Sequence, residues 1–263
     1  MLLGMAQWLN TIGRPDICYA VSSLSRYGSC PREGHLQLAL HLFGYLKKYP
    51  NRRIVFDSRD INFSDLNDDT SALRPDFLQD YPDAREELDK FFPRAFGRPL
   101  QTTICCDADH AHDKMTRRSI TGILGYVGRT PVFWMSKRQG AIATSTYSAE
   151  FMALRTATEE AISIRYMLRC LGIPLPSDGS YPTRIFGDNL SVINNARNPH
   201  SCLSKKHVAL SSRSVREGIA AGIISPFWLK GTFNQSDIMT KQIPAKEFLT
   251  HAANIFWLAP HRH

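Results

Sequence analysis

The sequence predicts an α/β protein in which a small helical segment precedes a mixed sheet with flanking helices. Two observations lead to this expectation. After residue 100, short apolar runs joined by turns are followed by strands and helices in alternation, which is typical of a sheet with helices on its faces. Before residue 50, apolar residues recur at helical spacing instead. The 43% hydrophobic content is enough to form a core, so wholesale disorder is excluded.

Residues 1–56 are the predicted helical segment. Pro15 suits the first turn of a helix. The apolar residues that follow it at helical spacing are Ile17, Val21, Leu24 and Tyr27. A second helix is predicted over residues 36–49, ending before Pro50. Its apolar side carries Leu36, Leu40, Phe43 and Leu46 or Lys47.

Residues 57–99 are predicted to be an acidic linker or insertion. Residues 57–90 hold 11 acidic side chains against 4 basic ones, prolines are scattered through the segment, and one short helix is expected over residues 84–92. By contrast, residues 91–263 hold 21 basic against 11 acidic side chains, and the whole chain carries a net charge of +8. This balance favours a polyanionic partner, most simply nucleic acid, over a merely soluble basic surface.

Residues 100–245 have the pattern of one α/β domain, followed by a helical tail over 246–263. Strands are predicted over 102–106, 120–127 and 131–136, the last two joined by a turn at 128–130. A long helix over 147–171 is followed by a strand over 184–187, a helix that opens at Asn189 and a helix over 206–221. A strand over 223–229 leads into a final helical part after Asn234.

Cysteine spacing and the lengths of apolar runs argue against several classes of protein. The six cysteines form no Cys-x-x-Cys pair, so neither a zinc ribbon nor a dense disulfide framework is indicated, and reduced thiols of the cytosol or nucleus are expected. No apolar run approaches the length of a membrane-spanning helix, and the first residues lack the pattern of a signal peptide.

Glu150 lies at a position where a carboxylate is unexpected. The apolar stripe of the long helix runs through Leu154, Ala157, Ala161, Ile164, Leu168 and Leu171. Extending this stripe toward the helix start reaches Glu150 and then Tyr147, so Glu150 is predicted on the buried face. A buried carboxylate is costly unless it is paired or binds a metal. The alternative is a first-turn acid that complements the helix dipole.

Three further acids lie at strand ends or helix starts. Asp188 ends an apolar strand, where ligands bind in open α/β sheets, although it could instead cap the next helix. Asp107 also ends a strand, and Asp109 is its rival because it shares the same face. Asp237 opens a helix after Asn234, a spacing that a capping box explains as well.

Taken together, these acids predict a metal site at one edge of the sheet. Clustered carboxylates repel one another unless cations lie between them. Oxygen ligands without Cys or His favour Mg²⁺ or Mn²⁺ over zinc. Two such ions would stabilise the attacking and leaving oxygens of a phosphodiester displacement. A basic surround would hold the phosphates, so nuclease chemistry is predicted.

Motifs in this region resemble the ribonuclease H domain of copia-type LTR retrotransposon polyproteins. They occur in family order over roughly residues 101–245. The motifs are Cys106-Asp-Ala-Asp-His-Ala-His-Asp113, Arg118-Ser-Ile-Thr-Gly122, Trp134-Met-Ser-Lys-Arg-Gln139, Ser145-Thr-Tyr-Ser-Ala-Glu-Phe-Met-Ala-Leu154, Gly187-Asp-Asn189, Lys205-Lys-His-Val208 and Ser236-Asp-Ile-Met-Thr-Lys241. The N-terminal Arg14-Pro-Asp-Ile17 and Ala20-Val-Ser-Ser-Leu-Ser-Arg26 resemble the reverse transcriptase thumb or connection region of the same polyproteins.

The resemblance implies a ribonuclease H-like mixed five-stranded sheet and a site of four carboxylates that binds two Mg²⁺ ions, with Mn²⁺ as a substitute. The family motifs place these carboxylates on Asp107, Glu150, Asp188 and Asp237, and so favour Asp107 over Asp109. The implied reaction is endonucleolytic hydrolysis of the RNA strand of RNA–DNA hybrids during reverse transcription. The implied partners are the hybrid and the upstream reverse transcriptase domain, in a cytoplasmic particle or in the nucleus.

Several residues depart from the family pattern or keep two explanations. The loop before Asp237 lacks the His that cellular relatives place there, and for His207 a structural role is favoured. The polymerase signature Tyr-x-Asp-Asp is absent, so no polymerase activity is expected and the chain resembles a C-terminal piece of a polyprotein. Two explanations stay open for four polar residues, namely contact with nucleic acid, or helix capping and a solvated helix face. The four are Asn189, Lys205, Lys206 and Arg213.

Two other functions stay open at this point. The first is a catalytically silent hybrid-binding or connection module, or a degenerate polyprotein fragment, which keeps the fold and the basic surface without cleavage. The second is an integrase-like or resolvase-like nuclease on the same sheet, against which the motif order argues. Cleavage of duplex DNA would distinguish this last class.

Overall fold

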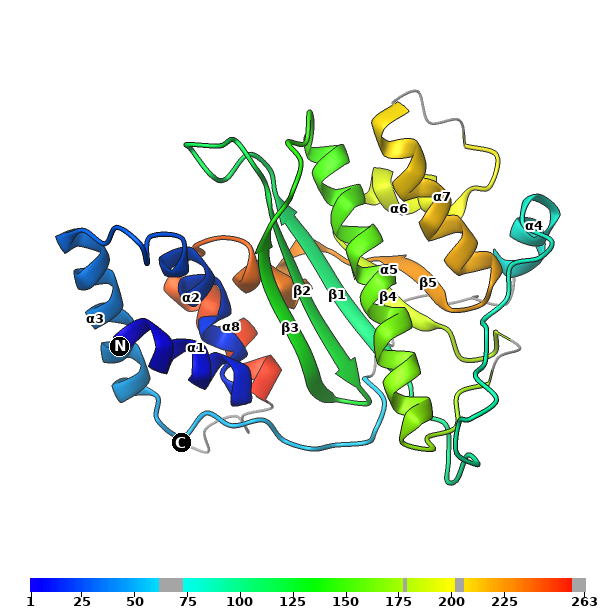
Figure 1. Ribbon diagram of the computed structural model, residues 1–263, viewed down its shortest axis with the longest axis horizontal. Helices are drawn as coiled ribbons and strands as arrows, with labels where there is room; N and C mark the ends of the chain where they lie inside the picture. The colour runs from blue at the N-terminus through cyan, green and yellow to red at the C-terminus, as the bar shows by residue number, and fades with distance from the viewer. Residues whose placement is uncertain (62–72, 177–178, 202–205, 257–263) are drawn as a thin grey trace.

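The centre of the computed structural model is a mixed five-stranded sheet with helices on both faces (Figure 1). The structure describes residues 1–61, 73–176, 179–201 and 206–256. The strands are β1 (Thr102–Asp109), β2 (Ile120–Val127), β3 (Thr130–Arg138), β4 (Thr183–Gly187) and β5 (Ile224–Trp228), in the order β3-β2-β1-β4-β5. β1 pairs antiparallel with β2 and parallel with β4. The predicted fold class, a mixed five-stranded sheet with flanking helices behind a small helical segment, is therefore confirmed.

One face of the sheet is covered by α5 (Thr146–Cys170), α6 (Leu190–Arg197) and α7 (Lys206–Ala220) (Figure 1). α5 packs along this face through the predicted apolar stripe, so that Leu154 and Ile164 meet Ile104 and Ile123 of the strands. The prediction of this stripe is wrong only at Leu171, whose side chain is exposed. α5 ends at Cys170, and Gly172, with a φ of +73°, then turns the chain away from the core.

The opposite face is covered by α2 (Cys18–Ser25), η3 (Gln235–Met239) and α8 (Ala245–Phe256). Cys18, Met239 and Ile255 pack there against Leu124 of β2. The helical segment thus contributes part of the core under the sheet. Two polar contacts extend this packing, because Ser22 Oγ donates to Ser136 O at 2.8 Å and Trp134 Nε1 donates to Asn10 O at 2.9 Å.

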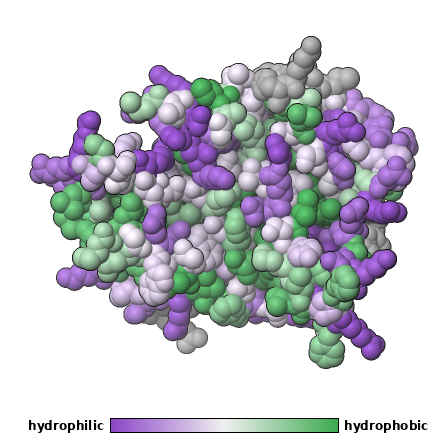
Figure 2. Space-filling model, viewed as in Figure 1, coloured by the Kyte–Doolittle hydropathy of each residue, from purple (hydrophilic) through white to green (hydrophobic). Residues whose placement is uncertain are grey.

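The rest of the helical segment consists of α1 (Leu2–Gly13), η1 (Pro15–Ile17) and α3 (Glu33–Lys48). The buried face of α3 carries Leu42 and Leu46, and Phe43 packs against the same cluster. The predicted apolar side is therefore correct at Phe43 and Leu46 but wrong at Leu36 and Leu40, which are exposed. The hydroxyl of Tyr45 donates to Asp16 at 2.5 Å, which fixes the rotation of α3 about its axis. In Figure 2, hydrophobic side chains consequently show at the surface over the N-terminal helices.

The acidic segment is attached to the α/β domain by a buried ion-pair cluster. Glu86 accepts hydrogen bonds from Arg165 Nε and Nη2, both at 2.8 Å, and from both Nη atoms of Arg169. The segment contains α4 (Leu73–Asp80), but residues 84–92 form no helix. The predicted helix is wrong there because the chain runs extended past α5, in the conformation that brings the Glu86 carboxylate to both arginines.

In the described ranges, no helix is both long and apolar enough to cross a membrane. Within the same ranges, the thiols of Cys18, Cys30, Cys105, Cys106 and Cys170 are free of disulfide bonds.

Replacing Glu86 by Ala should lower the free energy of unfolding by about 3 kcal/mol, because two buried guanidinium groups would lose their shared carboxylate. Urea unfolding of the full chain measures this change. Glu159→Ala is the matched control, since Glu159 pairs with Arg155 on the exposed side of α5 and should cost about 0.5 kcal/mol or less. Equal losses in the two variants would show that the cluster does not hold the segment.

Candidate metal centre

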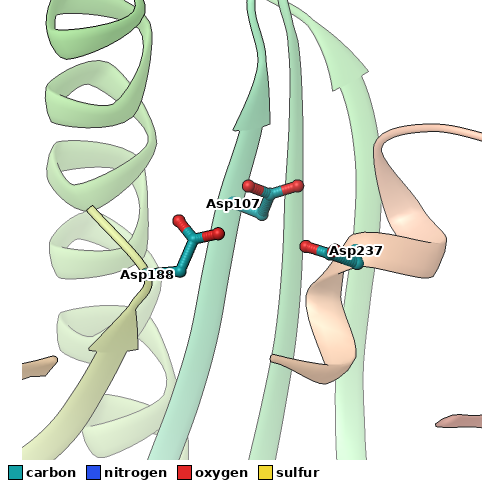
Figure 3. Close-up of side chains that lie close together, drawn as sticks. All are labelled: Asp107, Asp188 and Asp237. Carbon is teal, nitrogen blue, oxygen red and sulfur yellow. The ribbon is translucent and has the colours of Figure 1, made fainter. Parts of the chain in front are cut away.

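Three aspartates meet at one edge of the sheet, and we call Asp107, Asp188 and Asp237 the acid cluster. Asp107 is in β1, Asp188 directly follows β4, and Asp237 is in η3 (Figure 3). One carboxylate oxygen of each lies within 4.8 Å of the others. β1 and β4 run parallel with Cys105 opposite Phe186, so Asp107 and Asp188 are placed at the same level of the sheet. The structure therefore brings together three of the four acids expected from the sequence.

Glu150, the fourth expected acid, lies beside the acid cluster but outside the 4.8 Å group. It is in the second turn of α5 and is 8% exposed, as the helix periodicity predicts. Burial, followed by the negative charges of Asp107 and Asp188, raises the pKa of Glu150 to about 10. Its carboxylate is thus close enough to feel the field of the acid cluster.

A close approach between η3 and β2 places Asp237. Gly122 of β2 pairs with Asp107, and a Cβ atom at Gly122 would lie 2.6 Å from Thr240 Cγ2 and 2.8 Å from Met239 Cβ. Only a residue without a side chain leaves room for η3 at this point. Asn234 fixes the other end, because its amide donates to Cys106 O at 3.0 Å while its oxygen caps η3. Asp237 itself forms no capping box, and its carboxylate lies with those of Asp107 and Asp188 instead.

The acid cluster has unbalanced negative charge. Burial and the charge of Asp107 raise the pKa of both Asp188 and Asp237. Asp237 Oδ1 is buried and has no hydrogen-bond partner within the described residues. An unpaired buried carboxylate oxygen is costly in free energy. Its position beside two other carboxylates is the arrangement that a cation would stabilise.

Two residues of the turn after η3 oppose this charge. The hydroxyl of Thr240 donates to Asp107 Oδ2 at 2.5 Å and to the carbonyl oxygen of Asp237 at 3.1 Å. The Lys241 ammonium lies 3.1 Å from Asp237 Oδ2 and 3.8 Å from Asp107 Oδ2. Burial lowers the pKa of Lys241, but the charges of Asp107 and Asp237 outweigh this effect and raise it. Both residues belong to the Ser236–Lys241 motif, but the sequence alone indicates a role for neither.

The donor set fits a hard divalent cation. The acid cluster offers only carboxylate oxygens, which suit Mg²⁺ or Mn²⁺ better than zinc. Asp237 Oδ1 is a buried acceptor without a partner among the described residues, and the raised pKa values of Asp188 and Asp237 reflect repulsion that a cation would relieve. Asp107, Asp188 and Asp237 would hold such an ion, with Glu150 beside it.

Asp109 is not part of the acid cluster. Its carboxylate contacts His112 Nδ1 at 2.5 Å, and His112 Nε2 contacts the Tyr19 hydroxyl at 2.9 Å. Asp109 therefore joins the strand end to α2. Of the two acids that the sequence left as alternatives, Asp107 lies with the other aspartates and Asp109 does not.

The predicted nucleic-acid contacts are spread over the α6–α7 region. Asn189 caps α6, its side chain accepting from Val192 N at 3.2 Å, so Asp188 is not the cap. Arg213 is exposed on α7. Lys205 lies outside the described residues, and the side chains of Lys206 and His207 also lie outside the described part.

The backbone around Asp188 is fixed by residues that the sequence reasoning did not single out. Trp228 Nε1 donates to Asp188 O at 2.8 Å, which ties the end of β4 to the end of β5. Gly231, in η2 (Gly231–Phe233), approaches the Asp188 carboxylate so closely that a Cβ atom would lie 3.3 Å from Oδ2. No local sequence signal marks either contact, because both join segments about 40 residues apart.

Curated proteins of one kind match nearly the whole chain. The Retrovirus-related Pol polyprotein from transposon RE1 of Arabidopsis thaliana is 27% identical over 254 residues, and that from transposon RE2 of the same plant is 25% identical over 254 residues. The matches cover 97% of this chain. The chain is homologous to retrovirus-related Pol polyproteins of plant transposons. The family resemblance of the sequence motifs is thereby confirmed.

The chain spans only 14% of the length of each of these relatives. No protein-family model matches it. Among solved structures, RNase H1 from the halophilic archaeon Halobacterium salinarum NRC-1 is similar with a TM-score of 0.40 and 15% sequence identity, over 58% of this chain and 98% of that chain.

Replacing Gly122 by Ala should push η3 away from β2 and lower the free energy of unfolding by about 1–3 kcal/mol, the usual cost of overpacking. Because Asp237 moves with η3, binding of Mn²⁺ should weaken as well. Urea unfolding and calorimetric titration measure the two effects. Gly140→Ala is the control, since its Cβ atom would meet nothing within 4 Å. A Gly122→Ala variant as stable as the wild type would contradict the close approach.

Without metal, Glu150→Gln should be more stable than the wild type at pH 8. The pKa of Glu150 is raised in the folded state, so folding takes up a proton and the wild type loses stability as pH rises above the unfolded pKa. The advantage of the variant should shrink toward pH 5 by about 1 kcal/mol per pH unit. Thermal unfolding in EDTA between pH 5 and 8 tests this. A variant less stable than the wild type at pH 8 would contradict the charge repulsion.

Proposed function

We propose that this chain is a divalent-metal-dependent ribonuclease H that hydrolyses the RNA strand of RNA–DNA hybrids for a retrotransposon. The observation that carries the proposal is the acid cluster, in which carboxylates from β1, the end of β4 and η3 converge within 4.8 Å beside Glu150. Homology to Pol polyproteins supports this function over that of an unrelated nuclease. Activity of this chain on its own is part of the proposal.

When bound, two Mg²⁺ ions would activate a water molecule and stabilise the departing 3′ oxygen of the phosphodiester. Asp107, Asp188 and Asp237 would hold the ions, and Glu150 would add negative charge beside them. Thr240 orients Asp107 through its hydroxyl, and Trp228 fixes the backbone of Asp188. These contacts keep the ligands in place so that little reorganisation is needed during the reaction.

Binding of the hybrid would rely on positive charge outside the acidic centre. Residues 91–263 carry a large excess of basic side chains, and Arg213 is exposed on α7. Such charges bind phosphates in any sequence, so affinity should fall steeply with salt. Contacts to 2′-hydroxyls would distinguish the RNA strand from DNA. The hybrid, and a reverse transcriptase domain of the same polyprotein in a cytoplasmic particle, are the proposed partners.

The test is cleavage of end-labelled RNA annealed to DNA, with Mg²⁺ or with EDTA. Cutting should require Mg²⁺ and should fall by about a hundredfold or more in Asp188→Asn, which keeps the shape of the side chain but weakens metal binding. Asp109→Asn is the matched control, because Asp109 lies two residues from Asp107 but pairs with His112 outside the acid cluster. It should retain most of the activity.

Three results would contradict the proposal. Hybrid binding without cleavage would leave a silent binding module, and equal cleavage of duplex DNA would indicate a different nuclease class. If Asp109→Asn loses as much cleavage as Asp188→Asn, the reactive site does not lie at the acid cluster alone.

A further inference from the structure

Lys241 is a cation built into the acid cluster. It follows η3 by two residues, and its ammonium contacts Asp237 Oδ2 at 3.1 Å and Asp107 Oδ2 at 3.8 Å. Within the described ranges, no other cationic side chain forms an ion pair with Asp107, Asp188 or Asp237. The side chain is 37% exposed, so its long flexible stem has room to leave the site.

The contacts of Lys241 and those of a divalent ion overlap. The ammonium uses the Oδ2 atoms of Asp107 and Asp237, two of the three residues whose oxygens converge. An ammonium and a divalent ion that shared these oxygens would also repel each other at short range. Occupation by one therefore disfavours occupation by the other.

The two cations also differ in how much charge they balance. A single ammonium faces the three converging carboxylates of the acid cluster, and Asp237 Oδ1 has no hydrogen-bond partner in the described part of the chain. Lys241 reduces the repulsion among the acids without removing it. A divalent ion is the stronger competitor, and the protein without metal is still partly protected from repulsion.

We propose that Lys241 is an internal counter-ion that competes with the divalent metal for Asp107 and Asp237, so that it stabilises the metal-free protein and weakens metal binding. The inference rests on the proposed function, since it concerns the same metal site. It assigns a role to the end of the Ser236–Lys241 motif, beyond the aspartate that the motif contributes. Lys241 acts on the reaction through the ligands and is a positioning residue.

The test compares Lys241→Met with the wild type in the full chain by calorimetric titration with Mn²⁺ and by thermal unfolding. The variant should bind Mn²⁺ about tenfold tighter, as expected for loss of one partly buried charge contact. In EDTA it should melt below the wild type, because the acids lose their only paired cation among the described residues. In saturating Mn²⁺ this difference should disappear. A purely structural lysine would instead lower the melting temperature equally in both conditions.

Lys246→Met is the matched control, because Lys246 is exposed on α8 and no described residue forms an ion pair with it. It removes the same charge from the chain and should leave both measurements unchanged. Lys241→Arg keeps the cation and should bind Mn²⁺ as the wild type does. If Lys241→Met does not fold, Lys241→Gln gives the same comparison.

The outcomes separate this inference from the proposed function. Unchanged or weaker Mn²⁺ binding in Lys241→Met, with normal binding in the wild type, would overturn the competition and leave the ribonuclease intact. If the wild type shows no Mn²⁺ binding that is lost in Asp188→Asn, both the competition and the proposed function are overturned. Tighter binding together with the lost melting difference in Mn²⁺ would establish Lys241 as the counter-ion.

Discussion

The repulsion between carboxylates at one edge of the sheet is the constraint on which the rest of this structure depends. Asp107, Asp188 and Asp237 come from three segments that are far apart in the sequence and are held within 4.8 Å of one another. Each segment is fixed by uncharged contacts. β1 and β4 are held by their parallel pairing, and η3 by the missing side chain at Gly122 and the Asn234 amide. The rigid frame supplies the free energy that opposes the repulsion.

Segments outside the α/β domain contribute to this frame. α2 covers the sheet face under β2 and β3, and Tyr19 reaches the end of β1 through His112 and Asp109. Glu86 of the acidic segment binds Arg165 and Arg169 of α5, the helix whose second turn carries Glu150. The extra segments therefore bear on the position of the acids even though none of them supplies a carboxylate to the acid cluster.

Features that rest on local patterns could be predicted from the sequence. Apolar runs that end in Asp gave the positions of Asp107 and Asp188, and the 3.6-residue period of α5 gave the buried position of Glu150. Asp237 needed more than periodicity, because a capping box explains its spacing as well. The family motif favoured a site residue over a capping residue at this position, and in the structure Asp237 lies near Asp107.

Features that rest on long-range contacts could not be predicted in this way. The helix expected over residues 84–92 failed because Glu86 pairs with arginines about 80 residues away, a gain that no local propensity contains. The predicted apolar side of α3 was wrong only at Leu36 and Leu40, which are exposed. The hydrogen bond from Tyr45 to Asp16, which helps to orient this helix, is a long-range contact that the local apolar period does not contain. The roles of Gly122 and Lys241 depend on how close η3 comes to β2, which the sequence does not encode locally.

Anomalous diffraction from crystals grown with Mn²⁺ tests most directly whether the acid cluster binds divalent metal. We predict a peak in contact with the carboxylates of Asp107, Asp188 and Asp237 together, and its disappearance in Asp107→Asn. Mn²⁺ bound elsewhere on the protein, with no peak at these three carboxylates at saturating concentration, would contradict it.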